Sequence, residues 1–333
     1  MGCLLMSSIR SYRFSLALYF VVLIVLALIY FPVIDEFKKA VYVDRRMLLI
    51  KKTLIANHSR HINSTCNERA DLRGPHQKVI AYSIYGNLIQ PDVNRRYLKP
   101  LVETAKTILR VYPGWIIRIY HNLTSDDETW RLFRKTFQEA ALPGSHIDLC
   151  NATQIIQDHK LGKIFSMTWR WLPLLDDLVD TFMSRDADSP IIPREEDAVR
   201  EWLSGDRIFH VMRDHPKHCV SILGGLWGVK LDHERFKITN AANRMLKKNH
   251  LHTYDYDQTL LSRHIWPIAR TNVVAHDSYC CQYFPPARPF PTLRIGGGFV
   301  GMVGDLPAND NSTAAECPKQ CRPKNASSEW RYC

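Results

Sequence analysis

The stretch Thr181-Phe182-Met183-Ser184-Arg185-Asp186-Ala187-Asp188-Ser189-Pro190 sets the expected fold of the whole chain. A short apolar run before Asp-x-Asp predicts a buried strand that ends at two carboxylates. Side chains alternate between the faces of a strand, so the two acids can point the same way. Paired carboxylates suit a hard divalent cation, which keeps part of its shell for water or phosphate oxygens. Strand ends of open α/β sheets are also where ligands bind. A lone Asp-x-Asp also occurs in ordinary solvated turns. The surrounding sequence therefore decides between a turn and a metal site.

Strand and helix patterns alternate on the N-terminal side of this stretch. Apolar runs predict strands, and apolar residues at helical spacing predict helices. The predicted elements are strand 79–84, helix 97–111, strand 115–120, helix 126–141, strand 146–149 and a helix over 163–175. The order strand, helix, strand, helix, strand indicates a right-handed parallel α/β sheet of the Rossmann type, flanked by helices.

The pattern continues on the C-terminal side and then dissolves. We expect helix 194–203, strand 207–212, a glycine-containing segment over 221–229, helices beginning near residues 233 and 257, and a late strand at 272–275. After Pro285-Pro286 the sequence becomes rich in loop residues and cysteine. We therefore predict a catalytic domain over 78–304 and a Cys-containing tail over 305–333.

An apolar run near the N-terminus predicts a membrane anchor. Phe14 to Phe31 is uninterrupted except for Ser15, and a helix of this length spans about 27 Å, close to the thickness of a bilayer's hydrocarbon core. A cleaved signal peptide is the alternative, but its apolar region is normally shorter and no small-residue cleavage site follows. The predicted division is a cytosolic tail over 1–13, a transmembrane signal anchor over 14–34 and a lumenal stem over 35–77.

Glycosylation sequons and cysteines favour a lumenal body. The sequon asparagines are Asn57, Asn63, Asn122, Asn151, Asn311 and Asn325, all C-terminal to the apolar run. Eight cysteines also follow it, an even set that an oxidising compartment would pair, although the sequence does not give the connectivity. Zinc is the alternative for Cys317, Cys321 and Cys333, but no His accompanies them. The chain is thus expected to be a single-pass type II protein of the Golgi or ER membrane.

The charge of the chain favours anionic partners. The formal net charge is +11, which suits nucleotide diphosphates or acidic polysaccharides. The expected lumenal location argues against nucleic acid. A generic basic surface is the alternative.

The anchor, the βαβαβ half and the Asp-x-Asp strand together resemble nucleotide-sugar glycosyltransferases of the GT-A fold. The similarity covers about Lys78 to Gly304, and the order of motifs is most similar to that of glycogenin-like enzymes. There an Arg-bearing helix, the Asp-x-Asp strand, a glycine segment, an Asp-Gln element and a late metal-binding His follow one another. The matching residues here are Arg170, Asp186 and Asp188, Gly224-Gly225, Asp257-Gln258 and His276. In those enzymes the His opens His-x-x-Gly-x-x-Lys, whereas here Asp-Ser-Tyr-Cys-Cys follows it.

The resemblance implies a metal site and a phosphate-binding cation. Asp186 and Asp188, with His276, would hold Mn²⁺ or Mg²⁺ against the diphosphate of the donor, where the cation offsets the charge of the leaving group. Arg170 or Lys163 would bind a phosphate oxygen, and a structural ion pair is the alternative.

The resemblance also implies roles for the other residues of the site. Tyr82, Ser83 and Tyr85, at the end of the first strand, would flank the nucleoside. Gly224 and Gly225 would let the backbone approach a sugar, with a tight turn as the alternative.

Two further acids are candidate catalytic residues. Asp257 would orient the sugar or act as a base on the acceptor hydroxyl, with helix N-capping as the alternative. Asp214 or His215, directly after strand 207–212, could also reach the cleft.

The expected function is transfer of a sugar from a nucleotide-diphosphate sugar to a glycan, protein or lipid acceptor, with a divalent cation. Two other classes stay open from the sequence. Paired carboxylates would also serve a metal-dependent lumenal hydrolase, and a membrane-tethered glycan-binding protein could keep the fold without turnover.

Overall fold

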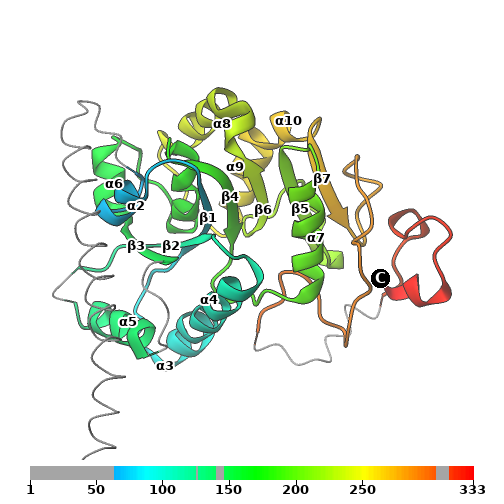
Figure 1. Ribbon diagram of the computed structural model, residues 1–333, viewed down its shortest axis with the longest axis horizontal. Helices are drawn as coiled ribbons and strands as arrows, with labels where there is room; N and C mark the ends of the chain where they lie inside the picture. The colour runs from blue at the N-terminus through cyan, green and yellow to red at the C-terminus, as the bar shows by residue number, and fades with distance from the viewer. Residues whose placement is uncertain (1–63, 125–126, 140–145, 305–314) are drawn as a thin grey trace, which may run out of the picture. The chain divides into compact units, whose positions relative to one another are not determined.

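The fold is built on a twisted, mostly parallel sheet whose strands occur in the order β3-β2-β1-β4-β6-β5-β7 (Figure 1). The computed structural model describes residues 64–124, 127–139, 146–304 and 315–333, which belong to the unit Ile62–Cys333. The strands are β1 (Gln77–Ser83), β2 (Ile116–His121), β3 (Ile147–Asn151), β4 (Val179–Arg185), β5 (Phe209–Arg213), β6 (Leu226–Lys230) and β7 (Val273–Asp277). The chain is therefore an α/β protein, as the sequence predicts.

One strand runs against the others. β6 is antiparallel to both β4 and β5, whereas β1 is parallel to β2 and β4, and β5 is parallel to β7. The segment between β5 and β6 contains only the short 3₁₀ helix η4 (Pro216–His218). A parallel return usually runs through an α-helix, which this segment does not contain. The start of β6 consequently lies at the same sheet edge as the end of β4.

Helices cover both faces of the sheet. The α-helices are α2 (Glu68–Arg73), α3 (Pro91–Val93), α4 (Lys99–Val111), α5 (Glu128–Glu139), α6 (Ala152–Asp158), α7 (Pro193–Ser204), α8 (Leu231–Leu246), α9 (Tyr256–His264) and α10 (Trp266–Ala269). The remaining helical turns are the π-helix η1 (Asn94–Leu98) and the 3₁₀ helices η3 (Ser166–Leu175), η6 (Lys319–Cys321) and η7 (Ser328–Tyr332).

Alternate residues of β1 enter two separate hydrophobic cores. Ile80 and Tyr82 pack in the core that α4, α5 and α7 cover, whereas Val79 and Ala81 pack in the core under α6, α8, α9 and η3. This alternation follows the period of two of an extended chain. A central strand that is covered on both faces is expected to be mainly apolar. The last residue of β1, Ser83, is polar and lines the cleft.

The predicted helix over 163–175 is a 3₁₀ helix over Ser166–Leu175 with Pro173 inside it. Proline has no N–H to donate, so it removes a hydrogen bond that a regular α-helix would need. This segment nevertheless leads into β4, as expected, and its side chains from Thr168 to Leu174 are buried.

All eight predicted lumenal cysteines are paired. The disulfides are Cys66–Cys150, Cys219–Cys280, Cys281–Cys321 and Cys317–Cys333. The zinc alternative for the tail cysteines is therefore wrong, because each of the three has a disulfide partner.

The predicted cytosolic tail and anchor, and the predicted stem up to residue 63, lie outside the described residues. Across the ranges that the structure describes, no helix has both the length and the apolar character to cross a membrane.

Candidate active site

A cleft of about 1330 Å³ opens at the sheet edge where β1 and β4 end and β6 begins. Its lining includes the residues after β1 (Ile84 and Tyr85), the turn after β4 (Asp186 to Ser189) and the entry to β6 (Gly224 to Leu226). Carboxyl ends of neighbouring parallel strands meet at one edge of an open α/β sheet, which is where such proteins bind ligands. The chain order thus brings three distant segments together.

The two acids of Asp-x-Asp both line this cleft. Asp186 keeps 36% of its side chain exposed, and Asp188 is more buried, at 13%. Burial, and next the neighbouring negative charge of Asp186, raise the pKa of Asp188 above its ordinary value. The cation nearest to it is Arg96, whose Nε lies 3.6 Å from Asp188 Oδ2. The two acids thus place negative charge on the cleft lining, and the exposed Arg96 offsets little of the charge of Asp188.

Arg170 is the buried cation between the carboxylates of the cleft. Its Nη1 donates to Asp186 Oδ1, and its Nη2 donates to Asp257 Oδ2 over 3.2 Å. Its backbone N–H donates to Ser83 Oγ over 2.9 Å, which ties η3 to the end of β1. Although burial alone would lower the pKa of Arg170, the two carboxylates raise it above its ordinary value. Arg170 therefore stays charged and links two predicted site residues.

Asp257 belongs to the cleft and not to a helix cap. The N-cap of α9 is Asp255, and Asp257 follows in the first turn with its side chain buried against Arg170. Within the described residues Asp257 Oδ1 has no hydrogen-bond partner. Burial raises the pKa of Asp257, and Arg170 offsets part of that rise. A buried carboxylate oxygen without a partner on the cleft lining is a free acceptor for a ligand hydroxyl.

Gly224 and Gly225 are there because the carboxylates come very close to the backbone. A Cβ on Gly225 would lie 2.0 Å from Asp186 Oδ2, and a Cβ on Gly224 would lie 2.1 Å from Asp257 Oδ2. Neither distance is compatible with a side chain. Close approach is the reason that the sequence suggested, but in the structure the approaching groups are the two acids.

The predicted nucleoside-flanking residues divide between cleft and core. Ser83, Ile84 and Tyr85 line the cleft, and Tyr85 is 39% exposed with its ring edge-on to Trp169 at 5.9 Å between centroids. Tyr82 is fully buried and packs in the core under α4. The prediction of Tyr82 as a ligand contact is wrong because its side chain is fully buried in this core and is not part of the cleft lining.

His276 is not placed beside the two acids. It lies on β7, and β6 and β5 separate that strand from β4. Its imidazole is buried, with Nδ1 2.9 Å from His210 Nε2 and Nε2 3.1 Å from Glu201 Oε2. The predicted role of His276 as a ligand to the same metal is therefore contradicted by its position. Within the described residues no group of three or more His, Cys, Asp or Glu side chains is arranged to hold a metal ion.

Asp214 is also absent from the cleft lining. Its carboxylate is fully buried and accepts hydrogen bonds from Arg194 Nε at 2.9 Å and from Arg294 Nη2 at 2.8 Å. Although burial works in the opposite direction, the two guanidinium groups hold the pKa of Asp214 below its ordinary value. A saturated, buried carboxylate is not placed to touch a substrate, so the predicted catalytic role of Asp214 is wrong.

The cleft contains residues that the sequence did not single out. His215 lines it, as one alternative suggested, and it is joined by His218, Phe299 and Arg96. Burial and the nearby His215 lower the pKa of His218 to about 4, so its imidazole is neutral at pH 7. Phe299 comes from the C-terminal loops, for which no periodic pattern exists in the sequence.

Searches of known protein families and of curated protein sequences found no match to this chain. Among solved structures, the galactosyltransferase LgtC in complex with donor and acceptor sugar analogues is 15% identical over 60% of this chain and 73% of LgtC, with a TM-score of 0.33. An active-site mutant of LgtC gives the same identity, coverage and TM-score. The mannosyltransferase Ktr4p from S. cerevisiae in complex with GDP is 11% identical over 64% of this chain and 62% of that protein, with a TM-score of 0.24. At TM-scores below 0.5 these likenesses carry no argument about function, and the function of this chain must be inferred from the geometry of the cleft.

Proposed function

We propose that this chain is a glycosyltransferase that uses a divalent cation and a nucleotide-diphosphate sugar. The observation that carries the proposal is the position of the two acids of Asp-x-Asp. Asp186 and Asp188 lie together on the lining of a large cleft, at the sheet edge where β1 and β4 end, with a charged Arg170 between the acids Asp186 and Asp257. The negative charge of a diphosphate is bound by cations, here Arg170 and a metal ion held by the acids. The hydroxyl groups of a sugar donate hydrogen bonds, which carboxylates accept.

The residues present fit a small divalent cation. Mg²⁺, and by the same oxygen-ligand chemistry Mn²⁺, binds through one or two carboxylates and takes its other ligands from water and substrate phosphates, so two acids without a third protein ligand suffice. Asp186 is partly open to the cleft, and Asp188 is buried next to it with its pKa raised. Residue 225 must be glycine for Asp186 to occupy its position. When bound, the cation would neutralise charge on the departing nucleotide diphosphate.

The other cleft residues supply binding and orientation. Arg170 would donate to a phosphate oxygen from its place between the two acids, and Tyr85 would pack against the nucleoside at the end of β1. The free Oδ1 of Asp257 would accept a hydrogen bond from a hydroxyl of the donor sugar. These groups orient the donor so that its anomeric carbon faces the open part of the cleft.

Thermal unfolding of the full-length chain with UDP or GDP, each with and without MnCl₂, tests the proposal. A ligand that binds only the folded state must raise the melting temperature. The transferase requires a rise that needs nucleotide and metal together. A rise with MnCl₂ alone would favour a metal-dependent hydrolase, and no rise in any mixture would favour a glycan-binding protein. Hydrolysis of a panel of nucleotide sugars then identifies the donor.

We further propose that the chain works in the secretory pathway as a type II membrane protein. Four disulfides need an oxidising compartment, and the sequon residues Asn122, Asn151 and Asn325 are exposed. Peptide N-glycosidase F should shift the chain's mobility after expression in animal cells. An unshifted chain that remains in the soluble cytosolic fraction would contradict this location.

A further inference from the structure

Three aromatic rings lie next to one another on the lining of the cleft. The ring centroids of His215 and Phe299 lie 4.5 Å apart, those of His215 and His218 5.3 Å, and those of His218 and Phe299 5.8 Å. We call these three residues the ring wall. Flat rings beside polar groups are a surface on which the apolar face of a sugar can pack.

The ring wall is joined to the acids by the segment that follows Phe299. Gly304 donates its backbone N–H to the carbonyl oxygen of Asp188 over 3.0 Å. Gly301 takes a left-handed φ of +86°, and a Cβ there would lie 2.6 Å from Leu226. The segment from Phe299 to Gly304 is thus a short, tightly packed connection between the ring wall and the turn that carries Asp188.

Asp214 fixes both ends of the ring wall. It directly precedes His215 in the chain, and its Oδ2 accepts a hydrogen bond from the backbone N–H of Val300, next to Phe299, over 3.0 Å. Its Oδ1 accepts from Ser278 Oγ at 2.5 Å and from Arg294 Nη2 at 2.8 Å. The buried carboxylate therefore holds two segments that are far apart in the chain.

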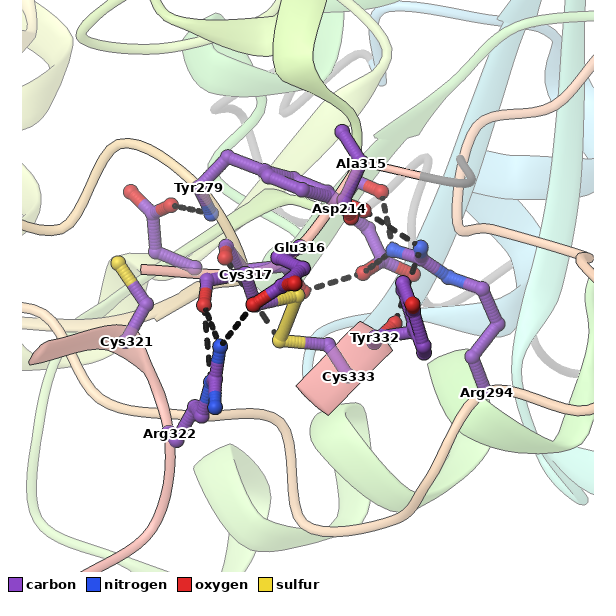
Figure 2. The surroundings of a disulfide bond; sticks show 12 residues. Asp214, Tyr279, Arg294, Ala315, Glu316, Cys317, Cys321, Arg322, Tyr332 and Cys333 are labelled. Carbon is purple, nitrogen blue, oxygen red and sulfur yellow. Dashed lines mark hydrogen bonds and ion pairs between the residues drawn. A yellow bond between two sulfur atoms is a disulfide. The ribbon is translucent and has the colours of Figure 1, made fainter. Parts of the chain in front are cut away.

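Arg294 connects this carboxylate to the C-terminal tail, Ala315–Cys333 (Figure 2). Besides Asp214, its guanidinium donates to Tyr279 Oη over 2.8 Å and to the carbonyl oxygen of Tyr332 over 3.4 Å. Its backbone N–H donates to the carbonyl oxygen of Cys333 over 2.7 Å. The tail is closed by the disulfide Cys317–Cys333 and attached to the body by Cys281–Cys321.

We propose that the disulfide-closed tail is a positioning element of the cleft, which acts through Arg294 and Asp214 to hold the ring wall as the acceptor-sugar side. The assignment of the wall to the acceptor rests on the proposed function. The positioning by the tail does not, because it needs only the contacts within the protein. Asp214 and Arg294 are positioning residues, since neither touches the cleft itself.

Chemical reactivity of the two histidines measures the position of the wall without any ligand. Diethyl pyrocarbonate modifies accessible neutral imidazoles, and peptide mass spectrometry gives separate rates for His215 and His218. His215 is only 4% exposed in the intact protein, so its modification should be slow. In Arg294→Gln we expect its rate to rise about fivefold or more as the wall opens locally, with part of that rise reversed in Arg294→Lys.

The matched control is Arg288→Gln. Arg288 lies on the same C-terminal segment and is 50% exposed, but its guanidinium pairs with Glu201 and contacts neither Asp214 nor the tail. The control should leave the rate at His215 unchanged. Equal rates in Arg294→Gln and the wild type, or an equal rise in both variants, would overturn the positioning role.

A second variant covers the case in which Arg294→Gln does not fold. The double substitution Cys317→Ser and Cys333→Ser opens the tail while leaving the other three disulfides in place, and it should raise the rate at His215 in the same way. An unchanged rate in the folded double variant would overturn the proposal.

Two further measurements distinguish binding of the donor from binding of the acceptor sugar. Stabilisation by UDP or GDP with MnCl₂ should persist in Arg294→Gln, since the Asp186 carboxylate keeps its ion pair with Arg170 and the Asp188 carboxylate keeps its ion pair with Arg96, and neither pair involves Asp214. Methyl pyranosides of glucose, galactose and mannose, added with nucleotide and MnCl₂, should slow modification of His218 in the wild type. If no pyranoside protects His218, the acceptor assignment fails. If the wild type shows no nucleotide-dependent stabilisation, the proposed function fails, while the reactivities still decide the role of the tail.

Discussion

The substitution Gly225→Ala adds one methyl group beside Asp186 and tests whether that carboxylate's position matters. Gly225 is not among the residues with positive φ, so alanine fits the backbone. Its Cβ would lie 2.0 Å from Asp186 Oδ2 and 2.3 Å from Asp186 Cγ. The carboxylate must therefore move by about 1 Å or more to reach an ordinary contact, and disturbing the groups that position a metal ligand typically costs about 10- to 100-fold in metal affinity.

The expected loss can be measured as a change in thermal stabilisation. At a nucleotide concentration about one hundred times the wild-type Kd, with MnCl₂ in excess, binding stabilises the fold by about 2.7 kcal/mol. A hundredfold weaker complex leaves about 0.4 kcal/mol. For a body of this size the wild-type melting temperature should rise by about 5 °C or more, and that of Gly225→Ala by about 1 °C.

Gly205→Ala is the matched control. A Cβ at Gly205 meets only backbone oxygens at 3.7 and 3.8 Å, which is ordinary contact, at the end of α7. It should keep the full nucleotide-dependent rise. The reasoning is refuted if Gly225→Ala also keeps the full rise, or if both variants lose it equally.

Three other predictions concern charge, pH and a disulfide. Arg170→Gln leaves the partly exposed Asp186 and the buried Asp257 without their ion-pair partner, so it should lower the free energy of unfolding by about 3 kcal/mol, mainly through Asp257. In urea titrations MnCl₂ should restore more stability to this variant than to the wild type, and equal responses would count against the ion pair. Burial lowers the pKa of His218 from 6.5 to about 4, so the unfolded chain binds a proton at this histidine at a higher pH than the folded protein does. The free energy of unfolding should therefore fall by up to about 3 kcal/mol as the pH drops from about 6.5 to 4. His218→Gln should flatten that part of the pH profile, and an unaltered profile would contradict the burial of His218. Replacing Cys66 and Cys150 by serine opens a loop with a sequence separation of 84 and should cost about 4.5 kcal/mol in the chain-entropy model. The loss should be visible as a lower melting temperature under oxidising conditions only.

Local patterns were enough for the elements that build the cleft. β1 and β4 are short apolar runs that end in polar residues, and an apolar run covered by helices on both sides has few alternatives. The acids Asp186 and Asp188 follow β4 directly, so their place at the sheet edge comes with the strand. Arg170 was expected on the segment before β4, and the structure places it between two of the predicted acids.

Long-range packing decided what local patterns could not. Asp214 and His276 both lie at the end of a strand, as Asp186 does. Yet Asp214 is saturated by two arginines, and His276 is buried between His210 and Glu201. Whether a polar residue at a strand end meets a cleft or a partner depends on segments far away in the chain. The antiparallel direction of β6 and the place of Phe299 on the cleft lining are likewise set by contacts between distant segments.

The most direct test of the metal site is a crystal structure of the full-length chain grown with MnCl₂ and UDP or GDP, measured at the manganese absorption edge. We predict an anomalous peak within about 2.2 Å of carboxylate oxygens of Asp186 and Asp188, bridged to the nucleotide phosphates, and its loss in Asp186→Asn. Nucleotide bound without metal at these acids, or manganese bound only elsewhere, would contradict the account.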